Sequence, residues 1–212
     1  MLLLPLLGLA LTACPAAPEG DDDDSVAAES FSFTNTGDPD LEGHTPRGFQ
    51  GQGGGLFAGD NLNAGFPEGD GVQIFLSVDI SDLLDGAWDV ESAVLSSEYG
   101  STSGRPFEDL GDLTAEEIRF EAFSSALWDA DLEAGGDSCV FGTSADGPFE
   151  CDLAAAVQNS LDDGYDYLQL RFRLDDAGDS DGSQDLVQFF ISNSNATEEG
   201  IFDLNVSAVP VD

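Results

Sequence analysis

The chain of 212 residues carries 43 acidic side chains against five arginines and no lysine, so its formal net charge at pH 7 is −38. Because phosphate binding needs basic side chains, this charge argues against nucleic acid and anionic membrane surfaces as partners. This charge is compatible with divalent cations, basic proteins and neutral glycans as partners. It is also compatible with the simpler explanation that the acidic residues keep the protein soluble at high salt. The hydrophobic content of 41% excludes a chain that is disordered throughout.

The first 13 residues predict a signal peptide of the bacterial lipoprotein type. An uncharged apolar run from Leu2 is followed by LTAC (11–14), which resembles the lipobox, the motif in which the cysteine receives the lipid. The run is too short to cross about 30 Å of hydrocarbon, which disfavours a membrane span; an ordinary secretory peptide is the alternative. We expect a mature protein that begins at Cys14 and is held by its lipid at the cell envelope, in the periplasm or at the surface.

Residues 14–29 predict a flexible acidic tether. The four aspartates Asp21 to Asp24 repel one another, and the segment has no apolar face to bury. The remaining residues, 30–212, are enough for one domain with a sizeable core but not for two. The predicted organisation is therefore a signal peptide (1–13), a tether (14–29) and one folded domain (30–212).

Short segments with alternating apolar and polar residues predict β-strands in the first half of this domain. Phe31 and Phe33 alternate with polar residues, whereas the segment 37–71, rich in Gly, Asp and Asn, predicts long loops with one or two edge strands. The clearest strand is GVQIFLSVDI (71–80), and a second apolar run follows at 90–99. One face of the first of these strands holds Ile74, Leu76, Val78 and Ile80.

The same alternation continues in the second half. EEIRFEAFSS (116–125) predicts a half-buried strand with Ile118, Phe120 and Ala122 inward and the charged residues between them outward. Three more strands are predicted in YDYLQLRFRL (165–174), DLVQFFIS (185–192) and IFDLNVSAV (201–209).

One helix interrupts this pattern. DLAAAVQNSLDDG (152–164) predicts a helix with Asp152 as its N-cap, Gly164 as its stop and one side formed by Leu153, Ala156, Val157 and Ser160. Several short strands with one inserted helix predict an all-β fold, a single β-sandwich or jelly roll. A parallel α/β sheet is disfavoured because helices do not alternate with the strands.

Cys139 and Cys151 form an even pair once Cys14 is assigned to the lipid. In an exported protein such a pair predicts a disulfide, and closing a loop of this size stabilises a fold by about 3 kcal/mol in the chain-entropy model. A metal-binding or redox pair is the alternative. It has neither CxxC spacing nor a nearby histidine in its favour.

The order of features from Gly71 to Val209 resembles the DNRLRE-type β-sandwich domains of secreted and surface proteins of bacteria and archaea. The segments that carry the resemblance are VDISDL (78–83), VESAVL (90–95), FECDLAAAV (149–157) and LQLRFRL (168–174). The third of them is similar to that family's strand-to-helix motif, with Ala154 in place of the family's threonine. The resemblance implies a jelly-roll module, and some relatives bind polysaccharide; it implies no particular binding residue.

The loop DDAGDSDGSQD (175–185) is a candidate calcium site. Hard oxygen ligands at short spacing, with glycines that permit a tight turn, are what Ca²⁺ requires. The loop is not an EF-hand, because the closing glutamate of that pattern is missing, and a plain hairpin turn in a very acidic chain is the stronger alternative. The candidate ligands are Asp176, Asp179, Asp181 and Asp185.

Three aromatic residues, Trp128, Trp88 and Tyr165, are candidates for a glycan-binding platform. Carbohydrate-binding modules usually present exposed aromatic rings to the sugar. The alternative is that these rings pack in the core or at sheet edges, which is commoner for Trp and Tyr in strands.

No catalytic motif stands out in the chain. His44 is the sole histidine and no GxSxG motif surrounds a serine, which disfavours a Ser-His-Asp hydrolase. Carboxylates such as Glu116, Glu117 and Glu121 are too numerous to indicate a particular pair for glycoside hydrolysis. We therefore expect a non-catalytic, lipid-anchored envelope protein whose sandwich interacts with a glycan or protein or has a structural role. Carbohydrate binding, with or without calcium, is the first alternative and a small hydrolase the second.

Overall fold

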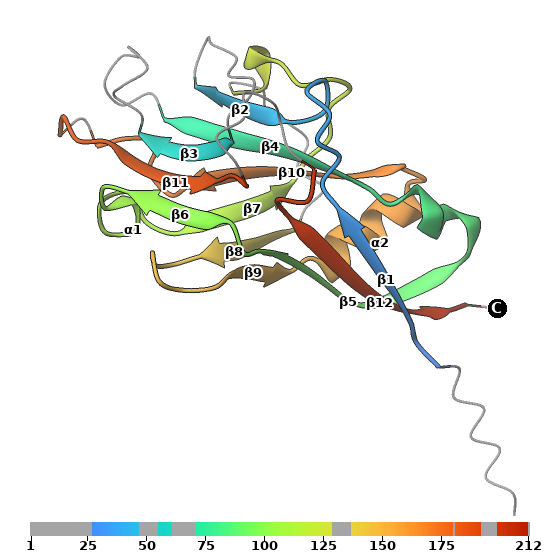
Figure 1. Ribbon diagram of the computed structural model, residues 1–212. Coiled ribbons are helices and arrows are strands. Elements are labelled where there is room, and N and C mark those ends of the chain that lie inside the picture. The colour runs from blue at the N-terminus through green and yellow to red at the C-terminus, as the bar shows by residue number, and fades with distance from the viewer. Residues whose placement is uncertain are drawn as a thin grey trace, which may run out of the picture.

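The computed structural model describes residues 27–46, 55–60, 71–128, 137–179, 181–191 and 199–211. These residues form two antiparallel β-sheets that pack face to face (Figure 1), so the prediction of an all-β sandwich is confirmed. The predicted signal peptide, the lipidation site Cys14 and all but the last three residues of the predicted tether lie outside the described residues.

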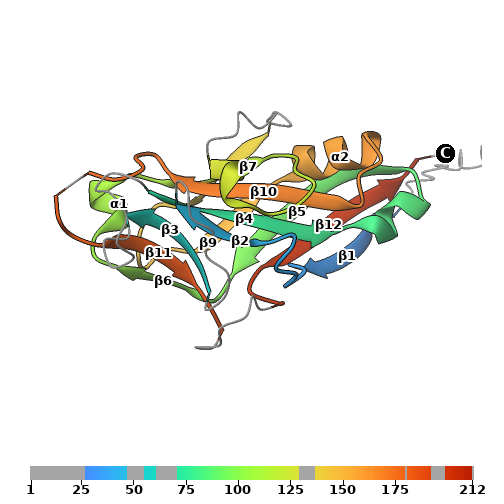
Figure 2. The ribbon, with the colours of Figure 1, turned by 90° about the horizontal axis from the view of Figure 1, so that it is seen from above.

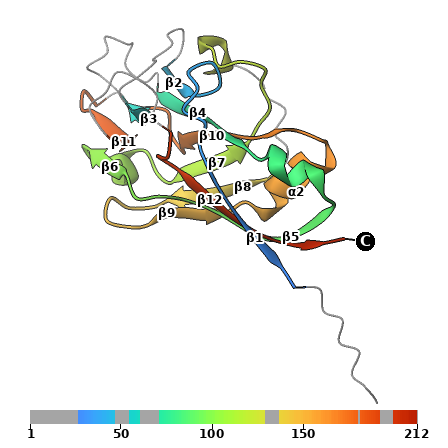
Figure 3. The same cartoon turned by 45° about the vertical axis from the view of Figure 1, so that its right-hand side comes forward.

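The smaller sheet has four strands in the order β1-β12-β5-β9. β1 pairs with β12 so that Phe31 lies opposite Val206 and Phe33 opposite Leu204. The predicted strands around Phe31, at 90–99 and at 201–209 are therefore confirmed, and β1, β12 and β5 run side by side (Figure 3). The strand bounds are β1 (Glu29–Thr34), β5 (Trp88–Ser97), β9 (Phe149–Asp152) and β12 (Asp203–Pro210).

The larger sheet has eight strands, seven of them in the order β6-β11-β3-β4-β10-β7-β8, while β2 pairs with β4. The predicted loop region 37–71 contributes both β2 and β3, but β3 lies inside the sheet rather than at its edge. The bounds are β2 (Gly43–Pro46), β3 (Leu56–Asp60), β4 (Val72–Asp79), β6 (Gly100–Ser103), β7 (Leu113–Glu117), β8 (Ser138–Gly142), β10 (Tyr167–Leu174) and β11 (Asp185–Phe189).

The predicted helix is α2 (Ala154–Asp162), and its expected inner side is buried. Its N-cap is Leu153; Asp152 lies one residue earlier than an N-cap would, where its Oδ1 accepts hydrogen bonds from the backbone N–H groups of Ala154 (2.9 Å) and Ala93 (3.1 Å). Gly164 follows the helix with φ of +72°, a conformation that favours glycine. The short elements are α1 (Pro106–Asp109) and the 3-10 helices η2 (Ser81–Asp85) and η3 (Ser125–Trp128).

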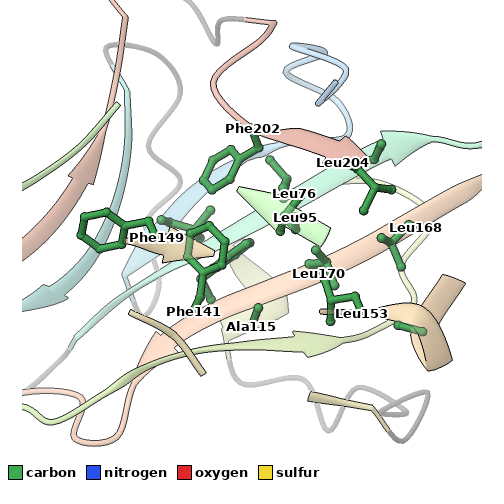
Figure 4. Close-up of a cluster of buried hydrophobic side chains, with 14 of the residues drawn as sticks. Leu76, Leu95, Ala115, Phe141, Phe149, Leu153, Leu168, Leu170, Phe202 and Leu204 are labelled. Carbon is green, nitrogen blue, oxygen red and sulfur yellow. The ribbon is translucent and has the colours of Figure 1, made fainter. Parts of the chain in front are cut away.

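The main core lies between the two sheets and is rich in phenylalanine. The ring of Phe141 lies 5.1 Å from that of Phe172, 6.0 Å from that of Phe189 and 5.8 Å from that of Phe202, between centroids. Leucines of β4, β5, β10 and β12 fill the rest of the layer (Figure 4). Burying a side chain of this size contributes about 1.5–3 kcal/mol, which makes this layer the main source of stability.

A disulfide joins Cys139 of β8 to Cys151 of β9, with 6.0 Å between the Cα atoms, and so confirms the predicted pair. β8 belongs to the larger sheet and β9 to the smaller one. The bond therefore links the two layers across a short connection.

The predicted strand at 116–125 is wrong beyond its first two residues. β7 ends at Glu117, whose side chain shares the buried face with Leu113 and Ala115. The chain then leaves the sheet, Ala122 is exposed, and Ile118 packs on the outer face against Phe75. β4 is consequently buried on both faces instead of one, because this segment and η3 cover its outer side.

Candidate functional site

The outer face of the larger sheet carries a second, smaller apolar cluster with a hollow on either side of it along β10. The cluster consists of Phe75, Ile118, Phe123 and Leu127, with Phe120 packed against it. The first hollow, which we call hollow A, lies toward the C-terminal end of β10, and hollow B lies toward its N-terminal end.

Hollow A has a volume of about 390 Å³ and contains the predicted aromatic Trp128. The ring is half-buried, and its indole N–H donates a hydrogen bond of 2.7 Å to the carbonyl of Gly71. Gln73 and Arg171 supply polar groups from the strands below. Trp128 therefore forms part of the wall of a hollow and is not an isolated exposed ring.

An ion-pair cluster borders hollow A. Both Arg171 and Arg173 bind the single carboxylate of Glu116, with Nη2 to oxygen distances of 2.7 Å and 2.5 Å. Burial acts to raise the pKa of Glu116, but hydrogen bonds and charges from Arg173 and Arg171 outweigh it and lower that pKa below its usual range. The three side chains of this cluster together carry one net positive charge, and the acids Asp175 and Asp176 line the same hollow.

Hollow B has a volume of about 480 Å³ and contains Tyr165, another predicted aromatic. Tyr165 is 44% exposed, and the guanidinium of Arg119 lies 4.6 Å from the centre of its ring. Tyr167 and Phe120 add apolar surface, and Gln169 adds an amide group. An exposed ring beside hydrogen-bonding groups is an arrangement that suits a small polar ligand with an apolar face.

The arginine of hollow B is held from behind by a buried acid. Glu117 is fully buried and lies 2.5 Å from Nη2 of Arg119, while the amide of Asn159 donates to its other oxygen at 3.1 Å. The same Nη2 also donates to the hydroxyl of Ser160 at 3.0 Å. Arg119 is thus neutralised and fixed in place, so that hollow B offers a rigid aromatic and hydrogen-bonding surface rather than a free cation.

Trp88 lies far from both hollows, on the smaller sheet. It is half-buried and makes an edge-on contact with Phe31, with 5.1 Å between ring centres. Its indole nitrogen is buried and has no hydrogen-bond partner among the described residues. The structure thus does not bring the three predicted aromatics together, and Trp88 packs at the core edge, as the alternative interpretation expects.

The predicted calcium loop is divided by the fold. Asp179 and Asp185 come together with Asp109 of α1, and one carboxylate oxygen from each lies within 4.8 Å of the others. Asp176 lies at hollow A instead, and the carboxylate of exposed Asp181 accepts a hydrogen bond of 2.6 Å from the backbone N–H of Ser183. Asp109 was missed by the sequence analysis because it is remote from this loop in the chain and carries no local signal.

A second acid that the sequence does not point out, Glu42, is fully buried. Its oxygens accept hydrogen bonds from Asn35 Nδ2 (2.9 Å), Thr36 Oγ1 (2.6 Å) and the backbone N–H of Gly37 (3.0 Å). Burial raises the pKa of Glu42 to about 7, against the lowering effect of these hydrogen bonds. The side-chain oxygen of Asn35 in turn accepts hydrogen bonds from the N–H groups of Ile201 and Phe202, so the network ties the start of the domain to the segment just before β12.

The residues considered for catalysis do not converge. Burial lowers the pKa of His44 to about 4, against a hydrogen bond to the Gly55 backbone, and the ring packs edge-on against Phe57 at 4.8 Å. Glu116 and Glu117 project from opposite faces of β7, each engaged by arginine. His44 is therefore a neutral packing residue near pH 7, and the two glutamates do not face each other.

Comparisons with known protein families and with curated proteins found no match to this chain. Within the described ranges, no helix has both the length and the apolar character needed to span a membrane.

Proposed function

We propose that this protein is a non-catalytic, lipid-anchored protein of the cell envelope that presents its β-sandwich for interaction with a partner. The observation that carries the proposal is where β1 begins and where the last described residues lie. β1, which follows the acidic tether, and the C-terminal residues lie at one end of the sandwich, whereas α1 and the turn into β11 lie at the other (Figures 1 and 2). A lipid on Cys14 would therefore hold one end near the membrane and direct the opposite end away from it.

The anchor is tested with the full chain in a bacterial host that lipidates proteins, fed an alkyne-bearing fatty acid. We expect the wild type to take up the label and to partition into the detergent phase, and the Cys14→Ser variant to lose both properties. The double variant Cys139→Ser/Cys151→Ser is the control, because it removes the other two cysteines and should keep the label. Labelling that survives Cys14→Ser would refute the anchor.

Hollow B favours a second candidate function, the binding of a neutral glycan. A sugar ring stacks its apolar face on an aromatic ring and hydrogen-bonds its hydroxyls at the side, and Tyr165 with Gln169 provides both kinds of contact. The net charge of −38 favours neutral over acidic polysaccharides. This candidate agrees with the resemblance to surface domains, some of which bind polysaccharide.

Glycan binding is tested by sedimentation of the protein with cellulose, chitin and insoluble xylan. We expect retention by at least one of them, and at least tenfold weaker retention of Tyr165→Ala, a loss typical of removing one stacking ring. Tyr99→Ala is the matched control, since Tyr99 is 40% exposed but lies outside hollow B. Equal retention of both variants, or no retention of the wild type, would remove this candidate.

A further inference from the structure

We propose that Asp109, Asp179 and Asp185 form a calcium-binding site at the end of the sandwich opposite the start of β1. The three residues come from the end of α1, from the β10–β11 connection and from the first position of β11. The site goes beyond the proposed function and does not depend on the lipid anchor or on hollow B.

Asp185 is the residue that points to a ligand. It is only 1% exposed, and its Oδ1 accepts a hydrogen bond from the backbone N–H of Arg105. Its other oxygen, Oδ2, is buried and has no hydrogen-bond partner among the residues that the structure describes. Buried carboxylate oxygens in native proteins are almost always hydrogen-bonded, paired with a cation or bound to a metal, so this oxygen is suited to bind a cation.

The surroundings of Asp185 are built closely around this carboxylate. Gly104 has φ of +74°, and a Cβ atom at that position would collide with Oδ1 of Asp185. Asp60 lies directly opposite Asp185 in the register of β3 and β11 and is itself 2% exposed. Cross-strand neighbours have Cβ atoms about 4.5–5.5 Å apart, so a second buried acid lies close to Asp185.

No protein cation neutralises the three ligands within the described part of the chain. The chain lacks lysine. Arg119 pairs with Glu117, Arg171 and Arg173 pair with Glu116, and the side chain of Arg105 is 68% exposed, 4.0 Å from Glu108. A bound metal ion would supply the positive charge that the side chains do not.

The spacing and the ligand type favour Ca²⁺. Calcium takes six to eight oxygen ligands at about 2.3–2.6 Å, so oxygens on opposite sides of it lie about 4.6–5.2 Å apart. The three carboxylate oxygens lie within 4.8 Å of one another, which fits around such an ion. Magnesium, with ligands at about 2.0–2.1 Å in near-octahedral geometry, tends to retain its waters and is seldom held by protein oxygens alone. Water and backbone carbonyls of the loops would complete the calcium shell.

Binding would link three segments of the chain through one ion. α1, the β10–β11 connection and the start of β11 all lie at the end of the molecule remote from the start of β1 (Figure 2). An ion between them would stabilise the folded state only, because the unfolded chain does not bring the three acids together.

The test uses the full chain in detergent, treated with EDTA and dialysed into 0.15 M NaCl, with CaCl₂ or MgCl₂ alone as the probe. Because the chain is so acidic, the salt is needed to screen non-specific ion binding. We expect 1 mM Ca²⁺ to raise the melting temperature by several degrees more than 1 mM Mg²⁺, and isothermal titration to give one tight calcium ion per chain.

Variants locate the ion. Asp185→Asn and Asp109→Asn should each weaken calcium binding at least tenfold. Asp109 is the second choice because its side chain is only partly buried, so that its replacement should leave the fold intact. Asp181→Asn is the matched control, an exposed acid of the same connection outside the cluster. Equal shifts with Ca²⁺ and Mg²⁺, or an Asp181→Asn loss as large as that of Asp109→Asn, would overturn the site.

Discussion

Two buried glutamates, Glu117 and Glu42, differ in the partners that stabilise their carboxylates inside this fold. Glu117 is stabilised by an arginine at 2.5 Å, whereas Glu42 has three hydrogen-bond donors and no arginine among the described ion pairs. Hydrogen bonds alone do not replace the hydration that a fully buried carboxylate loses, which is why the pKa of Glu42 rises to about 7. Glu42 therefore makes folding stability depend on pH near neutrality.

We predict that Glu42→Gln removes this dependence. Below pH 4.5 the carboxyl is protonated in both states; between pH 4.5 and 7 the unfolded chain releases the proton while the folded protein, with a pKa of about 7, retains it. The free energy of unfolding of the wild type should therefore fall over this range by about 3 kcal/mol relative to the variant. Urea denaturation of both proteins at pH 4.5 and pH 7.5 measures the difference.

The matched control for this prediction is Glu91→Gln, which changes an exposed glutamate of β5. It should follow the wild type at both pH values. If the difference between wild type and Glu42→Gln is the same at pH 4.5 and pH 7.5, the raised pKa of Glu42 is refuted.

At the scale of elements, the sequence predicts correctly those strands and helices in which the spacing of the apolar residues matches the side that is buried. β10 alternates between core-facing leucines and outward arginines, and α2 buries the side that its spacing indicates. Both elements have one face on the core and the other toward solvent or an ion pair. In such elements, apolar residues repeat about every 2 residues in a strand or every 3.6 in a helix, and this repeat shows directly which side faces the core.

The failures occur where a second layer covers the sheet. The alternation from Glu117 to Ala122 continues past the end of β7, because buried Ile118 and half-buried Phe120 pack on the outer face against Phe75 and not in the main core. The alternation of apolar and polar residues indicates which side chains are buried, but it does not indicate whether the core or the outer layer buries them. Glu117, read as outward, is buried because Arg119 and Asn159 reach it from the next turn and from α2.

The candidate sites were predictable to a similar degree. The acidic loop that contains Asp179 and Asp185 is visible in the sequence, and so are the aromatic residues Trp128 and Tyr165 of the two hollows. Asp109 and Arg119 reach their sites through the packing of α1 and of the segment after β7. Contacts of this kind depend on which strands pair in the folded protein, and the local sequence does not indicate that pairing.

At the scale of the whole molecule, the dominant property is the net charge of −38. The described ion pairs engage four arginines with only three glutamates, so most of the acids face no cation of the protein. Mutual repulsion of the remaining carboxylates acts against the compact state, and the cross-linked, phenylalanine-rich core has to offset it. The stability of such a protein should depend strongly on ionic strength.

We predict that NaCl stabilises the fold, most steeply at low concentration. Raising it from 0.01 M to 0.3 M shortens the screening length from about 30 Å to well under 10 Å, which removes repulsion between carboxylates on different parts of the surface. The melting temperature at pH 7 should rise by several degrees, where about 1 kcal/mol corresponds to about 2–4 °C for a chain of this size. The gain should level off above 0.3 M, since screening is then nearly complete, whereas a general salting-out effect would keep growing. A melting temperature that is constant or falls between 0.01 M and 0.3 M would mean that the acids are too widely spaced to oppose folding.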